Sequence, residues 1–167
     1  MQHDASHSAS QSGETHDHGA QHAYGLFALN VGASFLAMYL LMFSMIDGWS
    51  DFYNNINMVY MALSMVAPMA LLMLATMGGM YKNRRLNLIL WLGFALVFVA
   101  ALTATRKQAL VGDRQFVASM IPHHSGAILM CREADLNDPE LIKLCQSITA
   151  SQRSEIEQMR AILSRLK

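Results

Sequence analysis

A run of methionines at helical spacing is the feature of this chain with the clearest chemistry. They recur every three or four residues along one apolar stretch, as Met58, Met61, Met65, Met69, Met73, Met77 and Met80. At 100° per residue they fall within an arc of about 160°, so one helix would carry this methionine stripe on one side. Thioether sulfur is a soft ligand that suits Cu(I), whereas Mg and Ca prefer oxygen. The stripe predicts a copper-binding face, with ordinary apolar filling of a membrane helix as the alternative.

The apolar run before the stripe adds Met38, Met42 and Met45 at the same spacing. If two helices meet along these faces, sulfur atoms from both can share one Cu(I) ion. These three residues therefore join the predicted metal ligands.

A second set of metal-binding side chains lies in the N-terminal segment. Its histidines are His3, His7, His16, His18 and His22. Neutral imidazole binds Cu(II) or Zn well, and a flexible chain can wrap around an ion. We predict metal capture by this tail, chiefly through His16, His18 and His22, with Cu(II), Ag(I) or Zn as the ion. A merely solubilising tail is the alternative.

The third candidate site surrounds the sequence Met120-Ile121-Pro122-His123-His124. The chain from Asp113 to about Ala134, and from Pro139 to its end, has the pattern of two helices joined by a turn at 137–138, and positions equidistant from that turn face each other. This geometry places the two histidines opposite the middle of the second helix. The predicted metal ligands are Met120, His123, His124, Gln152, Glu155 and Met159. The alternative is a buried histidine that bonds to glutamine or glutamate.

The chain has two cysteines, Cys131 and Cys145, and the same hairpin geometry sets them opposite each other. Outside the cytoplasm a disulfide is our first interpretation, because it would staple a small hairpin. In the reduced state they would form a second soft-metal site with Met130. Small buried residues are the remaining possibility.

The composition indicates which elements must position these residues. With 167 residues, 53% apolar and 14% charged, the chain is not a multi-domain soluble enzyme. We predict an all-α fold with a disordered tail at 1–22 and a membrane domain at 23–107. Its three transmembrane helices span about 24–46, 56–81 and 86–105, each long enough to cross the hydrocarbon core. A helical hairpin at 108–167 completes the chain.

Local signals support the hairpin. Asp113 is the predicted cap of its first helix, and Asp138 caps the second, with Pro139 in the first helical position. A hairpin of this size has only half a core, so it should pair with a second copy as a four-helix bundle or pack on its own membrane part.

The charge distribution bears on partners and sidedness. No Lys or Arg precedes Lys82, so the electrostatic footprint of a nucleic-acid binder is absent. Lys82, Arg84 and Arg85 crowd the second loop, which places that loop and the tail in the cytoplasm and the hairpin outside. The partner that this predicts is the lipid bilayer.

The motif Phe-x3-Met-Ile-Pro-His-His-x2-Ala-Ile-x-Met, followed by Asp-Pro-Glu-Leu and Gln-x2-Glu-Ile-x2-Met, resembles the domain of unknown function 305 family (DUF305). The resemblance covers residues 116–163 and extends to membrane-anchored members with a His-rich tail and a Met-rich second span. It implies a ferritin-like bundle, usually extracytoplasmic in bacteria and hence on an inner-membrane protein, and an association with copper or other heavy metals. Both cysteines replace residues that are mostly small in the family, which fits a bridge across the hairpin.

The leading hypothesis is a non-enzymatic membrane protein that binds Cu(I) or Ag(I) for buffering, relay or resistance, with a copper pump or chaperone as partner. The alternative is a structural or interaction protein with a dimerising hairpin and no metal role. A ferritin-like metal oxidase is disfavoured, because neither His123 nor His124 has a glutamate three residues before it.

Overall fold

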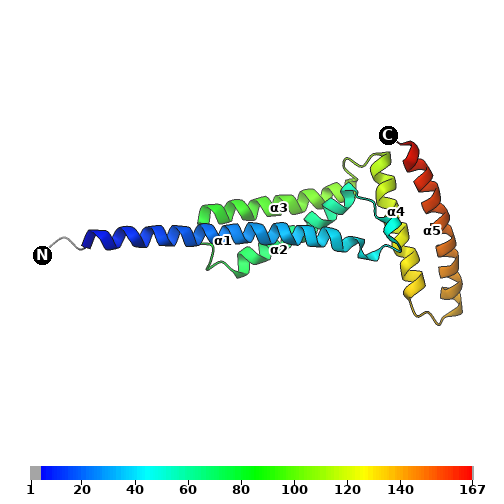
Figure 1. The fold of residues 1–167 in the computed structure, drawn as a ribbon, viewed down its shortest axis with the longest axis horizontal. Coiled ribbons are helices and arrows are strands. Elements are labelled where there is room, and N and C mark those ends of the chain that lie inside the picture. The colour runs from blue at the N-terminus through cyan, green and yellow to red at the C-terminus, as the bar shows by residue number, and fades with distance from the viewer. Residues whose placement is uncertain (1–4, 167) are drawn as a thin grey trace. The chain divides into compact units, whose positions relative to one another are not determined.

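The computed structural model describes residues 5–166, with side chains from His22 onward. This part of the chain consists of helices joined by irregular segments. Its elements are α1 (Ala5–Leu41), the 3₁₀ turns η1 (Met42–Met45) and η2 (Trp49–Asp51), α2 (Ile56–Thr76), α3 (Arg84–Lys107), α4 (Asp113–Glu133) and α5 (Pro139–Arg165), as Figure 1 shows. They form two compact units. The first takes in α1 as far as Ala37 together with Leu63–Ala101, and the second comprises Met38–Ala62 and the chain from Leu102.

Three helices are long and apolar enough to cross a membrane, by length and composition. They are His22–Met45, Ile56–Thr76 and Arg84–Lys107. The second is shorter than predicted, because Gly78 and Gly79 follow in a turn and glycine favours the end of a helix. Met77 and Met80 therefore lie beyond α2, and the expectation that one helix carries the whole stripe is wrong for these two residues.

The N-terminal segment also differs from its expected state. Residues 1–22 were predicted to be disordered, yet the backbone of α1 is helical from Ala5. Adding residues to a helix that is already nucleated costs little, so the apolar part of α1 can extend backward into the polar segment.

The core of the first unit joins all three apolar helices. Phe27 of α1, Leu74 of α2 and Tyr81 are buried in one cluster, with Phe94 of α3 packed against it. The ring centroids of Phe27 lie 5.6 Å from Tyr81 and 5.9 Å from Phe94, in edge-to-face arrangements that aromatic pairs favour. Aromatic packing therefore organises this unit.

The second unit is built on the predicted hairpin, in which α4 and α5 run side by side and antiparallel (Figure 1). Val117, Ile121 and Ile128 of α4 form its core with Ile156 of α5. Ile121 is completely buried. These four residues form the buried packing surface between the two helices.

The ends of the hairpin helices confirm one predicted cap and correct the other. The carboxylate of Asp138 accepts bonds from the backbone N–H groups of Glu140 and Leu141, at 2.9 and 3.0 Å. Asp113, in contrast, is the first residue within α4. Gly112 occupies the cap position, because its carbonyl accepts the first helical bond from the N–H of Phe116 at 2.8 Å.

A disulfide joins Cys131 and Cys145 beside the turn, with their Cα atoms 5.3 Å apart. The bridge links the end of α4 to the start of α5. A closed loop of this length stabilises the folded hairpin by about 3 kcal/mol in the chain-entropy account.

Candidate functional site

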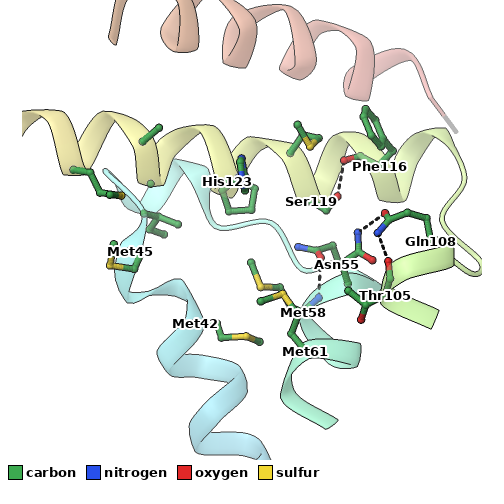
Figure 2. Close-up of a pocket in the computed structure, with 17 residues that line it drawn as sticks. Met42, Met45, Asn55, Met58, Met61, Thr105, Gln108, Phe116, Ser119 and His123 are labelled. Atoms are coloured by element: carbon green, nitrogen blue, oxygen red, sulfur yellow. Dashed lines mark hydrogen bonds between the residues drawn. The ribbon is translucent and has the colours of Figure 1, made fainter. Parts of the chain in front are cut away.

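A cavity of about 680 Å³ lies within the second unit and collects most of its sulfur atoms (Figure 2). The methionines that line it are Met42, Met45, Met58, Met61, Met120 and Met130. His123 is the one histidine among the lining residues. Three separate elements, η1, α2 and α4, therefore contribute soft ligands to a single space.

The spacing within each element explains why the methionines come in pairs. Met42 and Met45 are three residues apart in η1, and Met58 and Met61 are three apart in the first turns of α2. Residues at this separation lie on the same side of a helix. Figure 2 shows both pairs on the side of the cavity opposite α4.

Asn55 sets the position of the start of α2. Its side-chain oxygen accepts a bond from the N–H of Met58 at 3.1 Å, which caps the helix. Its side-chain nitrogen donates to the carbonyl of Ala118 in α4 at 3.4 Å. Because Asn55 is almost fully buried, it ties the helix that carries Met58 and Met61 directly to α4.

The segment between α1 and α2 is held on the hairpin by a polar cluster around the buried Asp51 and Ser125. The hydroxyl of Ser125 donates to the carboxylate of Asp51 at 2.6 Å and accepts from the N–H of Asp47 at 2.7 Å. Arg160 of α5 forms an ion pair with Asp51, and Arg132 forms one with Asp47. We call Asp47, Asp51, Ser125, Arg132 and Arg160 the docking cluster. It fixes η1 and its two methionines against α4.

Gly126 permits the close approach of η1 to α4. A Cβ atom at this position would lie 3.2 Å from the carbonyl oxygen of Met45. That separation is tighter than ordinary contact, so any larger residue would push Met45 away. Gly126 itself lines the cavity.

The two adjacent histidines of α4, both predicted as metal ligands, lie in different surroundings. His123 is exposed and lines the cavity, whereas His124 is buried against α5. Consecutive residues on a helix point about 100° apart, so only one of the two can face the cavity. Their ring centroids are 6.0 Å apart.

His124 has the bonding of a structural histidine. Its Nδ1 lies 2.8 Å from the carbonyl oxygen of Met120, and its Nε2 lies 2.8 Å from a carboxylate oxygen of Glu155. Both ring nitrogens thus lie within hydrogen-bond distance of oxygen atoms of the hairpin, and His124 does not line the methionine cavity. The alternative reading of a buried, hydrogen-bonded histidine describes this residue.

Glu155 is equally committed to the hairpin. Its second carboxylate oxygen accepts a bond from the hydroxyl of Ser151 at 2.7 Å. The hydrogen bonds from Ser151 and His124 lower the pKa of Glu155, because they stabilise its charged form. The carboxylate therefore serves the contact between α4 and α5.

The remaining predicted ligands are dispersed. Gln152 is half-buried on α5 away from the cavity lining, and Met159 packs against the hairpin core. Met73 packs in the aromatic cluster of the first unit, while Met65, Met77 and Met80 are about half exposed. Met38 and Met69 are partly buried and do not line the cavity. His22 is exposed, His3 lies outside the described residues, and so do the side chains of His7, His16 and His18.

The other common metal ligands, His, Cys, Asp and Glu, do not form a cluster in the part of the chain that the structure describes. Within it, no three side chains of His, Cys, Asp or Glu come together as a metal site. Both cysteines are consumed by the disulfide, so the alternative of a thiolate pair does not apply to this state. The methionine cavity is left as the candidate site.

The sequence did not reveal the residues that hold the cavity together but are not candidate ligands. Asn55, Asp51, Ser125 and Arg160 bond across sequence separations of 63 to 109 residues. The one local signal was charge, since Asp47 and Asp51 are the acidic residues of an otherwise uncharged loop.

Sequence comparisons place the chain among known proteins. The family described as Domain of unknown function (DUF305) matches residues 98–163. An uncharacterized protein of Acanthamoeba polyphaga mimivirus is 33% identical over 148 residues, which cover 85% of this chain and 93% of that protein. The chain belongs to the DUF305 family.

The DUF305 match takes in the end of α3, all of α4 and most of α5. It therefore includes His123, His124 and the docking residues Ser125 and Arg160, but not the methionines of η1 and α2. The similarity to the mimiviral protein extends well beyond this domain. No solved structure matches the chain.

Proposed function

We propose that this DUF305 protein binds Cu(I) and Ag(I) at a membrane, with the methionine cavity as its principal site. One observation carries the proposal: six methionines and His123, from three separate elements, line the same cavity. A methionine stripe on one helix is explained by apolar filling alone. Apolar filling does not explain why methionines from three elements surround one histidine.

The donor set favours a monovalent soft ion. Thioether and imidazole are neutral ligands that suit Cu(I), and the lining residues include no Asp, Glu or Cys. Ca²⁺ and Mg²⁺ need oxygen ligands, usually carboxylates, and a structural zinc site needs thiolate, imidazole or carboxylate ligands. When bound, the ion would be held by the methionine sulfur atoms and by His123.

The proposed topology places the protein in the inner membrane of a bacterial cell or its equivalent, with the second loop on the cytoplasmic side. Lys82, Arg84 and Arg85 support this orientation. The disulfide supports an oxidising compartment for the hairpin, since such bonds persist outside the cytoplasm. From there the protein would buffer Cu(I) or pass it to a pump or chaperone.

Association of the hairpin with a second copy is part of this proposal. Leu141 and Leu144 on the first half of α5 are 49% and 54% exposed. Apolar side chains in this position would be covered by a partner helix in a four-helix bundle. The same surface would serve the competing function, an interaction protein without a metal.

Equilibrium dialysis of the full-length protein in detergent tests the proposal. The reduced ion, Cu(I) or Ag(I), is offered without oxygen against a weak competing chelator, to wild type, to His123→Ala and to a variant without residues 1–21. We expect retention by wild type and by the tail deletion, and clear weakening in His123→Ala. His22→Ala is the matched control, because His22 is exposed and lies outside the cavity.

Two results would reject this function. One is no retention of either ion by the intact protein, which would leave the interaction protein as the better description. The other is loss of all binding on tail deletion, which would move the site from the cavity to the histidine tail.

A further inference from the structure

Two large apolar side chains stand out by their exposure. Trp49 is 89% exposed and Leu110 is 83% exposed, more than any other large hydrophobic residue that the structure describes. Both belong to the second unit, and both lie outside the three membrane-length helices. Trp49 follows the end of the first by four residues, and Leu110 follows the end of the third by three.

The structure holds these side chains outward. Trp49 begins η2, and Asp51 in the same turn is bound by Ser125 and Arg160. Leu110 has a φ of 59°, a left-handed conformation that costs a non-glycine residue roughly 1 kcal/mol. The hydroxyl of Tyr60 donates to the carbonyl of the preceding Ala109 at 2.9 Å, which helps to impose that conformation.

The surroundings of both residues are amphipathic. Trp49 borders an apolar hollow of about 610 Å³ that Leu41, Phe43 and Phe52 also line. Leu110 follows Arg106 and Lys107, which are exposed at the end of α3. Tryptophan, leucine and basic residues in combination are typical of protein surfaces at the membrane–water interface.

We infer that the loops carrying Trp49 and Leu110 insert together into the interfacial layer of the bilayer. The first and third of three consecutive spans run in the same direction, so their C-terminal ends emerge on the same side. Four extended residues reach at most about 14 Å, and the interfacial layer is roughly 5 to 8 Å thick. Both side chains are therefore within reach of it.

This insertion holds the hairpin unit at the membrane surface. Met45 and Gln108, which line the methionine cavity, lie four and two residues from the inserted side chains. The cavity would thus sit at the level of the lipid headgroups. The inference does not depend on metal binding, because it is drawn from exposure, backbone conformation and chain connectivity.

Tryptophan fluorescence in lipid vesicles tests the inference on metal-free, full-length protein. The chain has two tryptophans, so Trp91→Phe leaves Trp49 as the sole reporter. In vesicles of phosphatidylcholine, bromine near the top of the acyl chain should quench Trp49 roughly twofold more strongly than bromine near its end. Leu110→Trp, placed in a chain without Trp49 and Trp91, should behave in the same way.

Leu144→Trp in the same tryptophan-free background is the control, since Leu144 is half exposed on α5 and distant in sequence from any span end. We expect little quenching there. Quenching at positions 49 and 110 no stronger than at 144 would overturn the inference, as would stronger quenching by the deeper bromine. Quenching at 49 alone would reject the joint insertion of the two loops. Circular dichroism of each variant reports whether the helices are retained.

Discussion

The two halves of the methionine stripe have the same spacing and residue type but different surroundings. Met58 and Met61, in the second unit, line a cavity with His123 and with methionines from two other elements. Met73, in the first unit, packs among aromatic rings, and Met77 and Met80 lie in an exposed turn. Methionine at helical spacing is therefore a ligand candidate only where other elements bring further donors to it.

The two regions are also held together by different forces. Aromatic contacts around Phe27 and Tyr81 organise the first unit. The cavity of the second unit depends on hydrogen bonds and ion pairs, through Asn55 and the docking cluster. Polar bonds specify a single arrangement of η1 and α2 on α4, as a preformed site requires.

The largest predicted effect comes from removing sulfur in one half of the stripe. Met58→Leu with Met61→Leu preserves apolar volume but deletes two proposed ligands. Since changes in outer-shell residues alone often cost 10- to 100-fold in metal affinity, we expect the Cu(I) affinity to fall on the order of 100-fold. Competition with a chromophoric Cu(I) chelator measures this change.

Met73→Leu with Met77→Leu is the matched control, because neither residue lines the cavity. Its Cu(I) affinity should match that of wild type. Equal losses in the two double variants would show that the whole stripe binds metal and would erase the distinction between the halves.

Arg160→Ala should destabilise the second unit by about 1–2 kcal/mol. The substitution leaves the buried Asp51 carboxylate without its ion pair, and the cost is below that of a fully buried pair because Arg160 is partly exposed. Thermal unfolding followed by circular dichroism measures the loss. Arg153→Ala on the same helix is the control, since Arg153 forms no ion pair with the described residues. An equal shift in both variants would assign no special role to the docking cluster.

Gly126→Ala and Gly93→Ala compare one substitution in the two units. At Gly126 the added Cβ meets the carbonyl oxygen of Met45, whereas nothing lies within 4 Å of a Cβ at Gly93. We expect Gly126→Ala to weaken Cu(I) binding severalfold. Its stability should change by less than about 1 kcal/mol, because the helix propensity of alanine offsets the displacement.

Gly93→Ala should leave Cu(I) binding unchanged and alter stability by less than about 1 kcal/mol, because the added methyl group meets no neighbouring atom. Unaltered Cu(I) affinity in Gly126→Ala would argue against a role for Met45 in the site. Chelator competition and thermal unfolding give both numbers for each variant.

The smallest predicted effect concerns pH. Bonds from Ser151 and His124 lower the pKa of Glu155 below its ordinary value of 4.5. A group whose pKa is lower in the folded state adds stability above its unfolded pKa, and this contribution is lost as the pH falls through the folded pKa. The hairpin should therefore lose stability as the pH drops below about 4.5.

Glu155→Gln should flatten that acid-side loss, and Glu157→Gln, at an exposed position on the same helix, should not. Thermal unfolding across the acid range compares the two variants. If both follow the wild-type curve, the bond between His124 and Glu155 contributes nothing measurable to the fold.

Much of the secondary structure was readable in the sequence because its causes are local. Runs of apolar residues predicted the three membrane-length helices, and Asp138 followed by Pro139 predicted the start of α5. Where local signals conflicted, errors followed. Gly78 and Gly79 ended α2 before Met77, and Gly112 displaced Asp113 from the cap of α4.

The sequence indicated only part of the candidate site, and the reason is physical. The residue types, soft sulfur and imidazole, and their helical spacing are properties of the chain itself. Which of two adjacent histidines meets the methionines depends on the rotation of α4 against its neighbours. That rotation is decided by partners 31 to 109 residues away, such as Glu155 for His124 and Arg160 for Asp51, and only the tertiary structure brings them together.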